Sequence, residues 1–326
     1  MKNSINQLIR GGLMLVLVAF MASCSEIEEQ TAPMASSTLK SIPEVLKSLE
    51  TGDEGQNTNA RKSAGNTYAT FNAALGKSGL ASVFAKNELT VFAPTDAAFA
   101  ELNLNPGNIG SVEGLTDILL YHVVAGSVFA ADLTECFVPT VNGAAVEITL
   151  MGGPKVNDAN IILVDKQARN GVIHGIDKVL FPPTKNIMEL VNTTPGFSIL
   201  KFALEATGLD ATVATTNNLT VFAPTDVAFG ELVVELGFAD LDALVAAVGL
   251  DGLESVLKYH VFAGGRVYSS DLTNTDITMF SGEDVTVDVS GPKLIDVRGR
   301  ESMIIATDIQ ATNGVVHVID TVILNF

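Results

Sequence analysis

The stretch LTVFAPTDAAFAEL at Leu89–Leu102 returns later in the chain as LTVFAPTDVAFGEL at Leu219–Leu232, and the two differ at only two positions. Two further segments recur in the same order: YHVVAG at 121–126 returns as YHVFAG at 259–264, and NGVIHGID at 170–177 returns as NGVVHVID at 313–320. The offset between the copies grows from 130 to 143 residues along the chain. A solenoid would repeat every 20 to 50 residues or so, so the pattern indicates two tandem domains.

The length of the chain agrees with this division. A chain of 326 residues has a prior of roughly two domains, and each copy is long enough to form its own core. FPPT at 181–184 ends the first copy with two prolines that neither a helix nor a central strand accepts. We therefore expect domains at residues 39–183 and 184–326.

The N-terminus has the features of a targeting signal. Lys2 and Arg10 precede the short apolar run Leu13–Met21, which is too short to span a bilayer stably. MASC, which ends at Cys24, resembles a bacterial lipobox, so we expect residues 1–23 to be removed and Cys24 to carry lipid. The alternative is an ordinary secretory signal with an incidental cysteine.

A lipid anchor would hold the protein at a membrane without inserting its domains. Residues 24–38 are acidic and then small and polar, and they are expected to form a flexible tether. Ser25, directly after the cysteine, fits delivery to the outer membrane. We therefore expect a protein of the bacterial cell envelope that faces either the surface or the periplasm.

The charge balance of the chain excludes one class of partner. There are 19 basic against 37 acidic side chains, a formal net charge of −18. Binding to nucleic acid requires clustered Lys and Arg that neutralise phosphates, so nucleic acid is not an expected partner. With Cys24 committed to lipid, Cys136 is single, and we expect it to be a small, partly buried apolar residue.

Each copy is expected to begin with helices and end with strands, which gives an α+β fold with a mostly antiparallel sheet. The expected helices are 41–49, 71–80, 185–191 and 197–209. The expected strands are 89–93, 141–150, 161–165 and 172–180 in the first copy, and 219–223, 284–289, 304–307 and 315–324 in the second. Thr95 with Asp96, and Thr225 with Asp226, are expected to cap the helix that follows each of them. The first copy carries about 15 extra residues at Thr51–Gly65, which are expected to form an exposed loop.

The four histidines fall at equivalent positions of the two copies, but their spacing does not predict catalysis. His122 and His260 each end an apolar stripe with helical spacing, formed by Leu115, Ile118 and Leu119 or by Leu253, Val256 and Leu257. We expect both to be buried near a helix C-terminus, where the helix dipole favours some positive charge. His174 and Asp177, like His317 and Asp320, are three apart in a strand and therefore point to opposite faces.

The sequence gives no support to an enzyme. It contains no nucleophile elbow, no phosphate-binding glycine loop, no His or Cys pairs at metal-ligand spacing, and no alternating Asp residues of a calcium loop. We therefore predict no catalytic, cofactor-binding or metal-binding residues and no cofactor.

The three repeated segments together resemble the fasciclin-like family, and the resemblance covers both copies. It implies tandem domains, each a β-wedge with a cluster of helices, and a role as an extracellular adhesion or protein-interaction module. Tyr121-His122 and Tyr259-His260 match a Tyr-His element that is associated with adhesion in animal members. An Asp-Ile pair that those members also use is matched by Asp308-Ile309, whereas the first copy has Asp165-Lys166 instead.

The resemblance makes Asp308, Ile309, Tyr259, His260, Tyr121 and His122 the candidate partner contacts. The leading hypothesis is a non-catalytic, lipid-anchored envelope protein that contacts a protein, cell-surface or matrix partner. Two alternatives stay open. One is a binding protein for a small apolar or polymeric ligand, held in a groove between helices and sheet or between the two domains. The other is a passive envelope scaffold.

Overall fold

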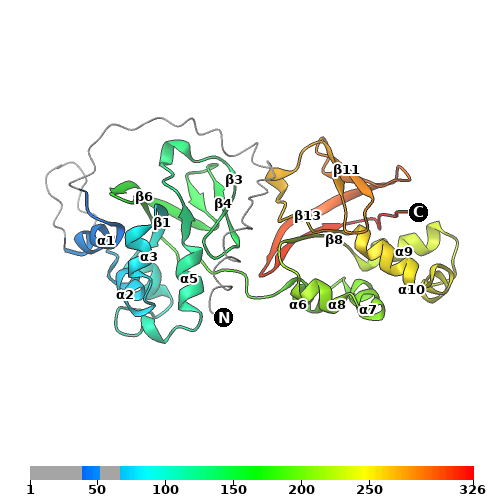
Figure 1. Ribbon diagram of the computed structural model, residues 1–326, viewed down its shortest axis with the longest axis horizontal. Helices are drawn as coiled ribbons and strands as arrows, with labels where there is room; N and C mark the ends of the chain where they lie inside the picture. The colour runs from blue at the N-terminus through cyan, green and yellow to red at the C-terminus, as the bar shows by residue number, and fades with distance from the viewer. Residues whose placement is uncertain (1–38, 52–66) are drawn as a thin grey trace, which may run out of the picture. The chain divides into compact units, whose positions relative to one another are not determined.

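The computed structural model describes residues 39–51 and 67–326. Within them the chain forms two seven-stranded sheets, one from each copy of the repeat, and each sheet is accompanied by helices (Figure 1). The expected α+β class with two tandem domains is confirmed.

The first domain contains these elements. Its helices are α1 (Ile42–Thr51), α2 (Ala69–Lys77), α3 (Ala81–Lys86), α4 (Asp96–Glu101), η1 (Ile109–Ser111), α5 (Leu115–Tyr121) and η2 (Ala130–Asp132), where η marks a 3-10 helix. Its strands are β1 (Leu89–Pro94), β2 (Val123–Ala125), β3 (Cys136–Pro139), β4 (Ala145–Thr149), β5 (Lys155–Val156), β6 (Ala159–Ala168) and β7 (Gly171–Ile176).

The second domain follows the same order. Its helices are α6 (Ile187–Thr193), α7 (Ser198–Thr207), α8 (Asp210–Thr215), α9 (Asp226–Glu235), α10 (Leu241–Tyr259) and η3 (Ser269–Asp271), and α10 is interrupted at Gly249. Its strands are β8 (Leu219–Pro224), β9 (Val261–Phe262), β10 (Thr275–Thr278), β11 (Asp284–Asp288), β12 (Lys293–Ile295), β13 (Glu301–Ala311) and β14 (Gly314–Ile319).

The strand orders are β2-β1-β7-β6-β5-β4-β3 and β10-β11-β12-β13-β14-β8-β9. The β1–β7 and β8–β14 pairs are parallel, and the other named pairs are antiparallel, so each sheet is mixed. In the first domain, helices α1, α2 and α3 gather at the β1 side while β3 and β4 lie at the other end (Figure 1). The repeated sequence therefore forms the parallel pair at the centre of each domain.

The central strands are buried along their whole length because apolar side chains cover both of their faces. All six residues of β1, β7, β8 and β14 are buried. On β1, Val91 and Ala93 pack into the core formed with the helices, while Phe92 packs into the second core, against the antiparallel strands. Continuous apolar runs such as LTVFAP are typical of strands buried on both faces.

The Asn-Gly pair before β7 and β14 fastens the helices to the sheet. Asn170 Oδ1 accepts from the N–H of Ile42, and Asn170 Nδ2 donates to the carbonyl oxygens of Phe84 and Asn87. Asn313 repeats this pattern with Ile187, Val213 and Thr216. One amide side chain thus satisfies backbone groups at the ends of two helices, which would cost free energy if they were buried unpaired.

Each turn residue after the first repeated strand has its own hydrogen-bonding role. Thr95 Oγ1 and Thr225 Oγ1 accept from the third residue of α4 and of α9, as expected for helix caps. The expectation that the adjacent aspartates cap the same helices is wrong. Asp96 accepts from the N–H groups of Ala69 and Thr70 at the start of α2, and Asp226 bonds Ser198 and Ile199 at the start of α7. An aspartate thus ties the preceding helix to this turn.

Some expected strands differ in extent from the observed ones. The stretch expected as one strand at 141–150 turns at residues 141–144, and the strand within it is β4, which pairs with β3. β7 and β14 end at Ile176 and Ile319, earlier than expected, because Asp177 and Asp320 turn to bond the backbone N–H of Asn160 and Met303. Apolar residues beyond these points are buried in coil, which periodicity does not distinguish from strand.

Some sequence predictions lie outside the described residues. These are the signal at 1–23, the lipidation of Cys24, the tether at 24–38 and nearly all of the loop at Thr51–Gly65. Among the described residues, no helix combines the length and apolar character needed to cross a membrane.

The glycine of the Asn-Gly pair is required by close packing. Gly171 has φ +144°, and a Cβ there would lie 1.8 Å from the carbonyl oxygen of Leu89. We expect Gly171→Ala to destabilise the first domain by more than about 2 kcal/mol, since backbone atoms would have to shift. The free energy of unfolding from urea titration measures this.

Gly76→Ala is the matched control in the same domain, because it lies in α2 and a Cβ there meets nothing within 4 Å. That substitution should be neutral or stabilising by up to about 1 kcal/mol. Equal losses for both variants would contradict the role given to Gly171.

Candidate functional site

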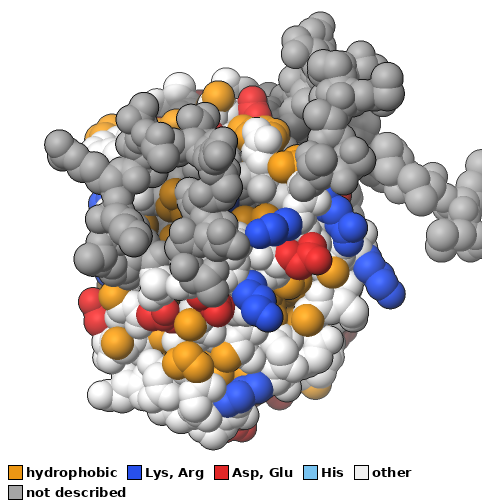
Figure 2. Space-filling view, turned by 90° about the vertical axis from the view of Figure 1, so that its left-hand side faces the viewer, with side chains coloured by type: hydrophobic (Ala, Val, Ile, Leu, Met, Phe, Trp, Pro, Cys, Tyr) orange, Lys and Arg blue, Asp and Glu red, His pale blue; other side chains and the backbone are white. Residues whose placement is uncertain are grey.

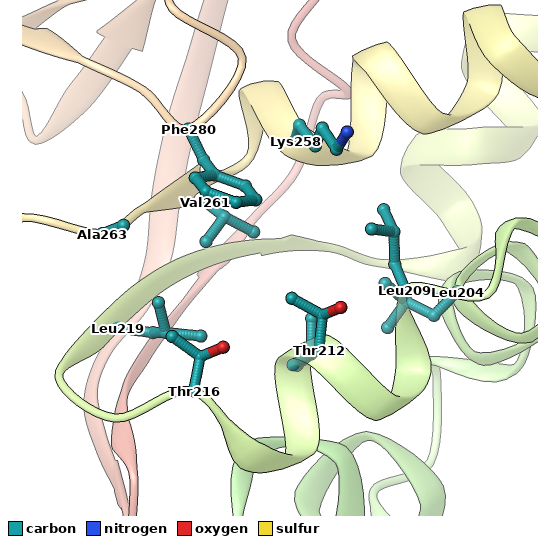
Figure 3. Close-up of a pocket in the computed structure, with 10 residues that line it drawn as sticks. Leu204, Leu209, Thr212, Thr216, Leu219, Lys258, Val261, Ala263 and Phe280 are labelled. Carbon is teal, nitrogen blue, oxygen red and sulfur yellow. The ribbon is translucent and has the colours of Figure 1, made fainter.

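One enclosed apolar cavity lies in the second domain, between helices and strands. Figure 3 shows Leu204 of α7, Leu209 just before α8 and Thr212 of α8 facing Val261 and Phe280. Its lining is apolar, but it encloses only about 30 Å³. That is room for one or two water molecules, whereas ligand pockets hold about 300 to 1,000 Å³. As it stands, this cavity does not admit the small apolar ligand of the alternative hypothesis.

The Tyr-His pairs are buried at the join between helix and sheet. His122 follows α5, and its Nδ1 lies 2.7 Å from the carbonyl oxygen of Ile118 while its Nε2 accepts from the N–H of Leu180 at 2.9 Å. His260 makes the same pair of bonds with Val256 and Ile323. Donation from Nδ1 and acceptance at Nε2 require the neutral tautomer.

The expectation that the helix dipole favours positive charge on these histidines is wrong. Burial lowers the pKa of both His122 and His260 to about 4, although hydrogen bonding to the helix carbonyl acts in the opposite direction. Desolvation of a charged imidazole is the larger effect because both rings are fully enclosed. These histidines hold the helix end against the segment that follows the central strand.

The tyrosines of the pairs are also occupied within the protein. Tyr121 donates from its hydroxyl to the carbonyl of Ala145, and Tyr259 donates to the carbonyl of Asp284. Burial raises the pKa of Tyr259 to about 12. A contact role for Tyr121, His122, Tyr259 and His260 stays a prediction, but all four side chains are buried in the folded domains.

Ala145 also takes part in a contact between the two copies. Gln310 Nε2 donates to the carbonyl of Ala145 at 2.8 Å, and Gln310 Oε1 accepts from the Ala145 N–H at 3.0 Å. The rings of Phe137 and Tyr268 stack beside it, with centroids 4.5 Å apart and planes 8° from parallel. The Tyr121 hydroxyl therefore supports a strand whose backbone is bound by the second copy.

Asp308 and Ile309 lie at a β-bulge in β13. Asp308 has φ +63° and accepts from the N–H and the hydroxyl of Ser269 at the start of η3. Asp165 has the same conformation in the first copy and accepts from the N–H of Ala130 at the start of η2. Ile309 is half-buried and packs against the core. The aspartate thus has a structural role that both copies share, and receptor contact by Asp308-Ile309 stays a prediction.

His174 and His317 are buried beside the same bulges. Nε2 of each ring lies within 2.9 Å of a backbone carbonyl, that of Val128 or Val267, and each ring stacks on Phe92 or Phe222. Asp177 and Asp320 bond the neighbouring strand instead, so neither forms a dyad with its histidine. Among the residues that the structure describes, no three His, Cys, Asp or Glu side chains are grouped to hold a metal ion. Cys136 is buried, as expected.

A cleft in the first domain was not predicted. It measures about 350 Å³ and is bordered by the end of α4, by the β5–β6 turn and by the segment after β7. Leu102 and Phe181 are exposed at its edge, and Glu101, Asp158 and Lys178 supply its charges. None of these residues belongs to a motif. The sequence signal that could have located the cleft is the greater length of the second copy at the equivalent helix and turn.

Comparison with known proteins accounts for the repeated segments. The model of the fasciclin domain matches the chain twice, over residues 66–182 and 195–325. The chain belongs to the fasciclin family. The repeated segments are therefore the parts of a fasciclin domain that form its central strand pair and the attached helices.

Relatives occur in animals and bacteria. The chain is 27% identical over 242 residues to the transforming growth factor-beta-induced protein ig-h3 of Sus scrofa, covering 72% of this chain and 34% of that protein. It is 40% identical over 129 residues to protein sll1483 of Synechocystis, covering 37% of this chain and 71% of that protein. The chain thus spans about a third of the length of ig-h3.

A solved structure of a fasciclin domain pair, from the insect cell adhesion molecule Fasciclin I, is also similar. It has 18% sequence identity and a TM-score of 0.39, and the match covers 78% of this chain and 95% of that one.

The buried histidines predict a loss of stability in mild acid. Their native pKa of about 4 lies below the unfolded value of 6.5, so the unfolded chain binds protons first as the pH falls. The contribution of these histidines to the free energy of unfolding is fully present above pH 6.5. We expect the free energy of unfolding to fall by roughly 2 kcal/mol per histidine between pH 7 and pH 5. Urea titrations across this range measure the slope.

His260→Gln removes one titrating group and should make the slope shallower by that amount, although it also lowers stability at pH 7. An unchanged slope would show that His260 does not supply the pH dependence.

The shared role of the two bulge aspartates can be tested against a contact role. We expect Asp308→Ala and Asp165→Ala each to lower the free energy of unfolding by about 1 kcal/mol, through loss of hydrogen bonds to the adjacent 3-10 helix. Both should leave attachment of cells unchanged. An attachment defect in Asp308→Ala alone, at equal stability, would assign a partner contact to Asp308.

Proposed function

We propose that this protein is a lipid-anchored adhesion or protein-interaction module of the bacterial cell envelope. The observation that carries the proposal is the match of two fasciclin domains, since the family implies adhesion or protein interaction. The lipobox-like MASC and the polar segment after it support an anchored position at the membrane.

The surface chemistry is consistent with protein partners. The net charge of −18 opposes binding to nucleic acid or to anionic lipid. On the face seen in Figure 2, basic side chains are separated by acidic and uncharged ones instead of forming one basic patch.

The two alternatives have less support. The apolar cavity of the second domain is too small for a ligand, and the larger cleft of the first domain is partly polar. A passive scaffold could be built from domains with any surface, and no contact among the described residues specifically favours that role. Protein interaction therefore has the stronger support.

The anchor can be tested by substitution at the lipobox. We expect Cys24→Ser to move the protein from the membrane fraction to the soluble fraction, because the acyl chains would have no attachment point. Cys136→Ala is the control and should stay in the membrane fraction. Fractionation followed by immunoblotting measures this, and a membrane-bound Cys24→Ser variant would refute the anchor.

The adhesion role can be tested in cells that carry or lack the protein. Protease treatment of intact cells shows whether the domains are accessible, and attachment of the deletion strain to protein-coated surfaces and to other cells shows whether they act there. We expect cleavage of the protein and reduced attachment. Full protection from protease together with unchanged attachment on every surface would refute the proposed function.

A further inference from the structure

The two domains differ where the helix after the first repeated strand ends, next to the turn between the two strands that precede the Asn-Gly pair. In the first domain α4 ends at Glu101, whereas its counterpart α9 continues for one more turn to Glu235. The β5–β6 turn has two residues, Asn157 and Asp158, whereas the β12–β13 turn has five, at 296–300. The second copy thus has two additions at neighbouring places.

In the second domain these two additions contact each other and cover the region between the end of α9 and the segment after β14. Arg300 Nη2 donates to the Glu235 carboxylate at 2.6 Å, and Arg300 Nη1 donates to the carbonyl of Val322 at 2.7 Å. Asp296 in the same turn accepts from the N–H of Leu324 at 3.0 Å. Leu232 and Leu324 are consequently 5% and 1% exposed. A guanidinium thus bridges the extra helical turn to the segment after the last strand.

The first domain lacks both additions, and its equivalent region is open. The cleft of about 350 Å³ lies there, between α4, the β5–β6 turn and residues 178–181. Leu102, which corresponds to Leu232, is 41% exposed, and Phe181, which corresponds to Leu324, is 55% exposed. Apolar side chains at equivalent positions are therefore buried in the second domain and exposed in the first.

The charges at the cleft favour a cation. Lys178 bonds Asp158 at 2.7 Å, and this bond together with the nearby carboxylates of Asp177 and Glu101 raises the pKa of Lys178. One ammonium group thus faces the carboxylate of Asp158 and is influenced by two more, and an excess of negative charge remains. In the second domain Arg300 lies between the carboxylates of Glu235 and Asp296.

We propose that the cleft of the first domain binds a turn or helix end of a partner protein that presents an arginine next to an apolar side chain. The arginine would take the place that Arg300 has in the second domain, with the carbonyl of Val179 and the carboxylate of Glu101 as acceptors. The apolar neighbour would cover Leu102 and Phe181. The inference rests on the proposed role in protein interaction and names its surface.

Arginine suits this cleft better than lysine. Its planar guanidinium donates in several fixed directions and therefore reaches a carbonyl and a carboxylate at once, as Arg300 does. The flanking apolar contact supplies affinity that exposed charge pairs alone do not give. Specificity should therefore need both parts of the ligand.

The test uses the whole chain without its signal and a peptide that reproduces residues 294–302 (LIDVRGRES), the segment that closes the second domain. We expect NMR shifts of backbone amides at 98–102, 157–158 and 178–181 on titration with the peptide. A peptide with citrulline in place of both arginines should bind at least fivefold more weakly, since citrulline keeps the shape and loses the charge.

Matched variants identify the site. Glu101→Gln and Phe181→Ser should each weaken peptide binding fivefold or more, while Glu231→Gln, the position in the second domain that corresponds to Glu101, should have no effect. Circular dichroism confirms that the variants are folded. Equal binding of the citrulline peptide, or no shifts at the cleft at millimolar peptide, would overturn the proposal.

One outcome would assign the cleft to the chain itself. Residues 52–66 contain Arg61 and Lys62, and if deleting this segment strengthens peptide binding tenfold or more, the segment competes for the cleft and the partner proposal is overturned.

Cells carrying Glu101→Gln with Phe181→Ser separate the cleft proposal from the proposed function. Full attachment by these cells, with the deletion strain defective, refutes the cleft as the partner site and leaves the proposed function standing.

Discussion

The parallel pairing of the LTVFAP strand with the strand that follows the Asn-Gly turn is the interaction on which each domain depends. In both copies it joins residues about 80 to 95 positions apart, and all six positions of both strands are buried. Helices cover one face and the antiparallel strands cover the other. A change at this pair therefore disturbs two cores at once.

The polar residues of the repeated segments serve that pairing. The Asn170 and Asn313 amides fasten helix ends to it, the histidines of the Tyr-His pairs connect α5 and α10 to the segment after it, and Asp96 and Asp226 hold the start of α2 and α7. Each of these side chains satisfies backbone groups that would otherwise be buried without partners. This explains why the two copies agree there, and why agreement between copies is a poor guide to contact sites.

The places where the copies differ are more informative about function. One extra helical turn and three extra turn residues close a corner of the second domain, and their lack leaves a cleft in the first. The exposure of Phe181 against the burial of Leu324 is the clearest sign, because both residues occupy the same position of the repeat. The closed region of the second domain therefore indicates which chemical groups could cover the open cleft of the first domain.

Much of the fold followed from the sequence, because the repeat fixes the domains and continuous apolar runs mark strands buried on both faces. The strands β3 and β10 and the early end of β7 did not follow, since pairing partners far along the chain decide them. The charge state of His122 was also misjudged, because a local pattern shows the helix dipole but not the complete enclosure that lowers the pKa to about 4.

The sequence by itself determined that the chain has two fasciclin domains and which residues form their centre, since these depend on local patterns repeated within one chain. Only the tertiary structure decided that the candidate Tyr-His side chains are enclosed, that Asp308 holds a 3-10 helix, and that a cleft lies between α4 and the segment after β7. Enclosure and clefts arise from segments that are distant in sequence and meet only when the chain has folded.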